Sequence, residues 1–169
     1  MATNKPTPTI PAKSFIDWLA IILATGFGSG YSPVAPGTAG TIVAVPIYIF
    51  LIFYCQVNIV GYLAITLLVI VVGSIAAHRA GKHFGLIDAG QIVVDEIAGF
   101  LVTMTAISLS WPSLILGFAL FRVFDIWKPW PASYFDRSVA NGFGVVMDDV
   151  VAGCYALAIL HALKFAQII

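Results

Sequence analysis

Four apolar segments in this chain of 169 residues are each long enough to cross a lipid bilayer. They cover residues 39–56, 59–76, 92–110 and 145–166, and a membrane-crossing helix needs about 20 mainly apolar residues, with a range of about 17–25. A fifth apolar segment, 112–126, is shorter. Hydrophobic residues make up 60% of the chain and charged residues only 9%, whereas about 25% of the residues in a soluble domain are charged. These values exclude intrinsic disorder and disfavour a soluble monomer.

We therefore predict an all-α fold, a polytopic membrane helix bundle with an N-terminal interfacial or re-entrant helix at about 15–25. That first apolar run is too short to cross a bilayer comfortably. Lys5 and Lys13 precede it as in a signal peptide, but no small-residue cleavage site follows, so we interpret the run as retained. Residues 1–14 are expected to form a flexible tail, and residues 15–169 a single membrane-embedded domain.

The distribution of charge predicts the orientation of the bundle. The N-terminal residues and the predicted loops 78–83 and 127–137 carry Lys and Arg, whereas the predicted loops 56–58 and 108–113 carry no charge. The positive-inside rule places the basic segments in the cytoplasm, and five spans then put the C-terminus outside. Eight Lys and Arg balance eight Asp and Glu, so no basic field for nucleic acid is present. The sequence leaves the oligomeric state open.

Five of the eight acidic residues fall at span ends on the predicted cytoplasmic side. Asp95 and Glu96 open the third span, Asp125 closes the fourth, and Asp148 and Asp149 open the fifth. Acidic residues are costly in a bilayer and usually functional there. Adjacent residues on a helix diverge by about 100°. One member of each adjacent pair is therefore expected to face a common centre, unless the helix start is irregular, and the sequence leaves open which one.

Two cations and a glycine-rich loop accompany these acids. Arg122 lies three residues before Asp125, which places both on one helix face, and Lys128 follows where Pro129 ends regular helix. The loop 26–40 holds five glycines before the first span. Such a loop can present backbone N–H groups to a phosphate, although it lacks the Walker A pattern. It fits a tight connection between helices equally well.

This combination predicts metal-assisted phosphoryl transfer or hydrolysis. Clustered carboxylates suit a hard cation such as Mg²⁺, and cations beside them suit a phosphate group. Cys55 and Cys154 lie outside the acidic segments and no Asp-x-Asp pair is present, so water activated by the metal or a carboxylate is the expected nucleophile. An alternative is a membrane transporter or ion pathway that uses the acidic cluster, which would place the acids near the bilayer midplane.

These motifs resemble those of the phosphatidylglycerophosphatase A family, over a stretch from about residue 18 to the end of the chain. The matching segments are 26–30, 32–33, 35–38, 94–96, 121–131, 135–137, 148–149 and 151–153. The resemblance implies a magnesium-dependent lipid phosphatase of the bacterial inner membrane, with its active site facing the cytoplasm. It would hydrolyse phosphatidylglycerophosphate, a phospholipid substrate in the bilayer, to phosphatidylglycerol and inorganic phosphate.

The resulting hypothesis assigns roles to nine residues. Metal binding is assigned to Asp95, Glu96, Asp125, Asp148 and Asp149. Asp95 or Asp149 is expected to take a proton from the attacking water. Arg122 and Lys128 would neutralise the phosphate oxygens, and Thr38 and the backbone of Gly37 would help to bind the phosphate.

Overall fold

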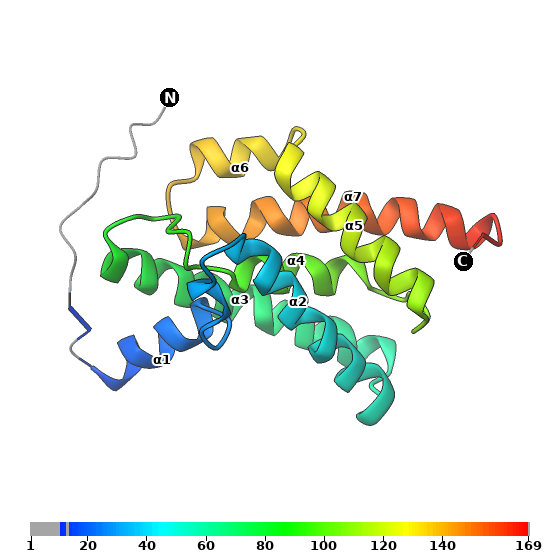
Figure 1. Ribbon diagram of the computed structural model, residues 1–169, viewed down its shortest axis with the longest axis horizontal. Helices are drawn as coiled ribbons and strands as arrows, with labels where there is room; N and C mark the ends of the chain where they lie inside the picture. Colours follow the sequence, from blue (N-terminus) through cyan, green and yellow to red (C-terminus); the bar gives the residue numbers. More distant parts are fainter. Residues whose placement is uncertain (1–10, 13, 169) are drawn as a thin grey trace.

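A computed structural model describes residues 11, 12 and 14–168, so most of the predicted tail 1–14 lies outside the described residues. The described residues contain seven α-helices and no strand, which confirms the predicted all-α class (Figure 1). The elements are α1 (Phe15–Ala24), the 3₁₀ turn η1 (Ser29–Tyr31), α2 (Pro36–Ile49), the π-helical turn η2 (Phe50–Tyr54), α3 (Ile59–Phe84), α4 (Val94–Thr103), α5 (Trp111–Trp127), α6 (Ala132–Ser138) and α7 (Gly142–Phe165).

Within the described part of the chain, three helical stretches are long and apolar enough to cross a membrane. They are α2 with η2 (Pro36–Tyr54), α3 and α7. Leu67, Val71 and Ile75 recur every four residues along α3, and all three side chains are exposed. Such a stripe of apolar side chains has lipid acyl chains as its natural neighbours, because water would solvate it poorly. The fold therefore agrees with a polytopic membrane bundle.

The predicted third span, 92–110, is wrong in length. Its helix, α4, has ten residues and is buried along almost its whole length among α2, α3, α5 and α7. Tyr62 Oη donates to the carbonyl of Leu101 and Tyr48 Oη to the carbonyl of Ile107, both at 2.7 Å. The backbone can therefore leave the helix inside an apolar core without losing its hydrogen bonds. Of the five predicted spans, three reach spanning length, and α5 has 17 residues.

Two segments predicted as loops are helical. The basic segment 78–83 forms the last turns of α3, which ends at Gly85 with a φ of 74°. Positive side chains are favourable near a helix C-terminus, and glycine readily adopts the left-handed conformation that ends the helix. The segment 127–137 contains most of α6, which starts directly after Pro131.

The glycine-rich segment 26–40, which runs through η1 and into the first turns of α2, fixes the start of α4. A Cβ atom at Gly30 would overlap the carbonyl of Gln91, and one at Gly40 would lie 2.6 Å from Cβ of Val93. The backbone N–H of Val93 donates to the carbonyl of Ala24 at 2.8 Å. Glycines at these positions let two backbone segments approach closely. Most of the loop is therefore a tight connection that positions the first turn of α4.

Candidate active site

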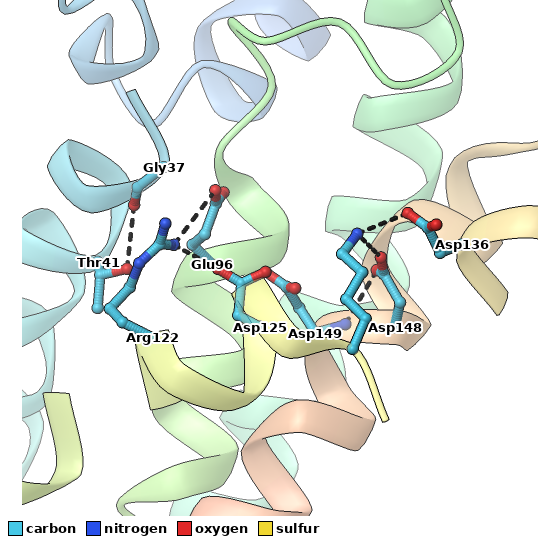
Figure 2. Close-up of polar contacts among 9 residues, drawn as sticks. Gly37, Thr41, Glu96, Arg122, Asp125, Asp136, Asp148 and Asp149 are labelled. Atoms are coloured by element: carbon cyan, nitrogen blue, oxygen red, sulfur yellow. Dashed lines mark hydrogen bonds and ion pairs between the residues drawn. The ribbon is translucent and has the colours of Figure 1, made fainter. Parts of the chain in front are cut away.

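Acidic residues from three helices lie near one another (Figure 2). Asp95 and Glu96 lie in the first turn of α4, Asp125 in the last turn of α5, and Asp148 and Asp149 about two turns into α7. The four aspartates are buried, with exposed fractions between 3% and 8%. Because carboxylates are strongly solvated in water, burying several of them together is costly unless cations compensate them.

Three of these carboxylates, which we call the acidic triad, lie close together. Asp95, Glu96 and Asp149 each offer one oxygen, and these oxygens lie within 4.8 Å of one another. Asp95 Oδ1, Glu96 Oε2 and Asp149 Oδ2 are buried and accept no hydrogen bond from the described residues. Unpaired buried oxygens cost free energy, and carboxylate oxygens are the ligands that hard divalent cations prefer. The triad could therefore hold a metal ion.

The two pairs of adjacent acids behave differently. Both Asp95 and Glu96 reach the triad, against the expectation that neighbours on a helix diverge. The side chain of Glu96 has one methylene more than that of Asp95, which extends the reach of its carboxylate. In the second pair, only Asp149 joins the triad, and Asp148 turns toward Lys128.

Arg122 lies beside the triad and pairs with two carboxylates. Its Nη1 is 2.5 Å from Asp125 Oδ2 and 3.7 Å from Glu96 Oε1, and the Asp125 carboxylate lies next to Asp149 (Figure 2). The spacing of three residues thus places Arg122 and Asp125 on one helix face, as predicted. Arg122 Nε is buried and donates to no acceptor of the described residues, so the guanidinium retains a donor for an anion.

The first turn of α2 covers this guanidinium. A Cβ atom at Gly37 would overlap Glu96 Oε1 and would lie 3.1 Å from Arg122 Nη1. Thr41 Oγ1, one turn further along α2, donates to the carbonyl of Gly37 at 3.0 Å. Gly37 therefore approaches the site closely because it lacks a side chain. Thr38, the other residue of α2 expected at the site, has an intermediate exposure.

Lys128 forms a separate network on the other side of Asp149. It lies just after α5 with a φ of 47°, and its Nζ is 2.6 Å from Asp136 Oδ1 and 2.5 Å from Asp148 Oδ2. Burial disfavours the ammonium form, but the charge of Asp148 and the hydrogen bond to Asp136 outweigh this effect and raise the pKa of Lys128. Lys128 thus ties the end of α5 to α6 and α7.

Two residues near these networks, Asp136 and Thr41, were given no role at the site by the sequence analysis. Asp136 falls within the predicted loop 127–137. Nothing in the sequence spacing links it to Lys128, because Pro129 and Pro131 interrupt the helix between them. Thr41 lies four residues after Gly37. In a helix that starts at Pro36, this spacing predicts that Thr41 lies on the same face as Gly37.

Comparisons with known proteins agree on one family. The model of the family described as phosphatidylglycerophosphatase A matches residues 22–164. The chain is 40% identical over 166 residues to phosphatidylglycerophosphatase A of Haemophilus influenzae, covering 98% of both chains. It is 40% identical over 141 residues to the Escherichia coli protein of that name, covering 83% of this chain and 80% of the relative.

A third relative carries a different name. It is a Bacteroides thetaiotaomicron protein, provisionally named as a phosphatidylinositol-3-phosphatase, and it is 37% identical over 154 residues. The match covers 88% of this chain and 95% of that protein. No solved structure gives a significant match.

Proposed function

The chain belongs to the phosphatidylglycerophosphatase A family, and from this premise we propose that it hydrolyses phosphatidylglycerophosphate to phosphatidylglycerol and inorganic phosphate. The observation that carries the proposal is the buried acidic triad next to Arg122. A phosphatase that acts on a lipid phosphomonoester needs charge neutralisation at the end of a membrane bundle, where the headgroup lies. The triad and the guanidinium provide groups of both signs at such a place.

We infer that the triad binds a divalent cation, and we propose Mg²⁺. The three unpaired oxygens of Asp95, Glu96 and Asp149 support this ion, because Mg²⁺ takes oxygen ligands and keeps several waters. When bound, the ion would supply Lewis acidity to the phosphoryl group. The predicted ligand roles of Asp125 and Asp148 stay predictions, since Asp125 pairs with Arg122 and Asp148 with Lys128.

The proposed reaction is a displacement at phosphorus by water. The water oxygen forms a bond to phosphorus, and the ester bond between phosphorus and the glycerol oxygen breaks. Asp149 or Asp95 accepts the proton of the attacking water, and a proton returns to the leaving glycerol oxygen. Arg122 neutralises the phosphate oxygens and uses Nε, which has no acceptor of its own. The missing side chain at Gly37 leaves room for the Glu96 carboxylate and for this guanidinium.

Lys128 receives a more indirect role than the sequence suggested. Its ammonium is already paired with Asp136 and Asp148, so direct neutralisation of the phosphate would require breaking one of these pairs. We therefore assign Lys128 as a positioning residue. By pairing with Asp148, Lys128 positions the turn of α7 from which Asp149 joins the triad.

The proposed location is the bacterial inner membrane, with the site at the cytoplasmic face. Asp95, Glu96 and Asp125 lie in end turns of α4 and α5. The adjacent aspartates of α7 lie about two turns from its start, rather than midway along this spanning helix as an ion pathway would require. The positive-inside rule supports the cytoplasmic side, because Arg79 and Lys82 lie near the C-terminal end of α3.

The test is phosphate release by the purified full-length protein in detergent micelles. Phosphatidylglycerophosphate is compared with phosphatidylinositol 3-phosphate and phosphatidic acid, each with Mg²⁺ and with a chelator. We expect release from phosphatidylglycerophosphate that the chelator abolishes and added Mg²⁺ restores. Lys164→Gln, near the other end of α7, is the control and should keep full activity. Faster release from the inositol lipid would reassign the substrate, and release unaffected by the chelator would remove the metal from the proposal.

A further inference from the structure

A second polar site lies between α1 and the last turns of α3. It is a pocket of about 270 Å³, which we call the basic pocket. Its lining residues are Pro11, Ala12, Asp17, His78, Arg79, Lys82 and His83. None of these residues belongs to the acidic triad or pairs with Arg122 or Lys128, so the basic pocket is separate from the proposed active site.

The basic pocket has an excess of positive charge. His78, Arg79, Lys82 and His83 occupy one face of α3, because they follow the spacing of adjacent helical turns. Asp17 is the single carboxylate among the described lining residues, and its Oδ1 is 2.9 Å from Arg79 Nη1. Lys82 is exposed and pairs with no carboxylate of the described residues. Attraction to the helix C-terminus explains why cations are tolerated there, but it does not explain a pocket between them and α1.

The helix that forms the other wall is suited to the membrane interface. Phe15, Trp18 and Ile22 on α1 are exposed, at 82%, 56% and 47%. The ring of Trp18 lies 6.5 Å from the ring of His83, at the edge of the basic pocket. Short helices with exposed aromatic and aliphatic side chains lie at the boundary between headgroups and acyl chains. These features of α1 suit a pocket that opens at the depth of phospholipid headgroups.

We propose that the basic pocket binds the phosphodiester group of an anionic phospholipid. A phosphodiester has one negative charge and two free oxygens, which match the donors of Arg79 and Lys82. The volume exceeds what a phosphate needs and admits the headgroup alcohol. Acyl chains attached to this group would lie along the exposed apolar side chains of α1. Basic pockets between membrane helices bind anionic headgroups by the same forces.

The chemistry of the basic pocket indicates binding without hydrolysis. The described lining residues include one carboxylate, already paired with Arg79, and offer no equivalent of the acidic triad. A lipid held there would be an accessory ligand, and the proposal does not depend on the activity of the chain.

The experiment measures binding of short-chain phosphatidylglycerol to the full-length protein in uncharged detergent micelles, by calorimetry in the presence of a chelator. Short-chain phosphatidylcholine and inorganic phosphate are the comparison ligands. Lys82→Gln should weaken phosphatidylglycerol binding about fivefold, the effect of one cation near an anionic lipid surface. Asp17→Asn should strengthen binding, because it removes the lone negative charge of the pocket. Lys164→Gln removes a cation in the last turn of α7, which does not line the basic pocket, and should leave binding unchanged.

Lys82→Gln and Asp17→Asn are expected to change the lipid affinity in opposite directions. This difference distinguishes lipid binding from a contact that only attaches α1 to α3. If the Arg79–Asp17 pair only attaches α1 to α3, Asp17→Asn will lower the melting temperature and will not raise affinity, and the proposal is overturned. Equal affinity for phosphatidylcholine and phosphatidylglycerol overturns it as well. Displacement of the lipid by equimolar inorganic phosphate, with Lys82→Gln weakening both, would identify the ligand as free phosphate and exclude the lipid.

Discussion

Arg122 and Lys128 lie six residues apart near the end of α5, yet the networks around them differ in one respect. Around Lys128, both oxygens of Asp148 are paired, one with the ammonium and one with the backbone N–H of Asp149. Around Arg122, Glu96 Oε2 and the neighbouring Asp149 Oδ2 are buried without a hydrogen-bond donor.

This difference indicates that one network has a structural role and that the other is suited to binding a ligand. A carboxylate with both oxygens paired is satisfied within the protein and can hold helices together. A buried carboxylate oxygen without a donor carries a free-energy cost, which a bound cation removes. The Lys128 network therefore stabilises α5, α6 and α7, and the acidic triad beside Arg122 is the part suited to a metal ion and a phosphate.

Replacing the two adjacent aspartates of α7 one at a time tests this division most strongly. Asp149→Asn should lower kcat about 10²–10³-fold, because it removes one ligand of the proposed metal. Asp148→Asn should lower kcat much less, since its carboxylate serves Lys128. Phosphate release at saturating Mg²⁺ measures both variants. Equal losses in the two variants would show that Asp148 also binds the metal, and the division between the networks would fail.

A methyl group at Gly37 tests whether the reaction depends on the close approach of α2 to Glu96 and Arg122. Gly37→Ala should lower kcat/KM about 10–100-fold, because its Cβ would displace Glu96 and the guanidinium from their positions. Gly90→Ala is the matched control, since a Cβ there meets no atom within 4 Å. Full activity of Gly37→Ala would mean that the reaction does not depend on the positions that α2 gives to Glu96 and Arg122.

The structural role of Lys128 is measurable as a coupling energy. Lys128→Gln leaves Oδ2 of the buried Asp148 carboxylate without its cation and should destabilise the protein by about 1–3 kcal/mol. The double variant Lys128→Gln/Asp148→Asn should recover part of this loss, because it removes the uncompensated charge as well. Thermal or denaturant unfolding in detergent gives the three values. Strictly additive losses would contradict the pairing of Lys128 with Asp148.

Metal binding should stabilise the fold. This is the smallest of the effects expected in the four predictions. With free Mg²⁺ at ten times its Kd, the folded protein should gain about 1.4 kcal/mol. Asp148→Asn should retain this gain and Asp149→Asn should lose it. Melting curves with Mg²⁺ and with a chelator give the comparison, and an Mg²⁺ effect that persists in Asp149→Asn would place the ion elsewhere.

The residues of the site were predictable to different degrees. Arg122 and Asp125 follow from a spacing of three within one helix, and the structure places them 2.5 Å apart. The partners of Lys128 do not follow from spacing, because the chain leaves the helix at Pro129 and returns to Lys128 through α6 and α7. Local periodicity predicts contacts within a helix, and it contains no information on which distant helix lies beside it.

The chain's own hydropathy and charge pattern determined the all-α class, the helices of spanning length and the clustering of acids near helix ends. Tertiary contacts alone decided that α4 stops after ten residues, because apolar composition cannot distinguish lipid from protein neighbours, and Tyr48 and Tyr62 come from other helices to satisfy its carbonyls. They also decided that Asp149 and not Asp148 joins the triad, because the pairing of a buried oxygen depends on donors that are distant in the sequence.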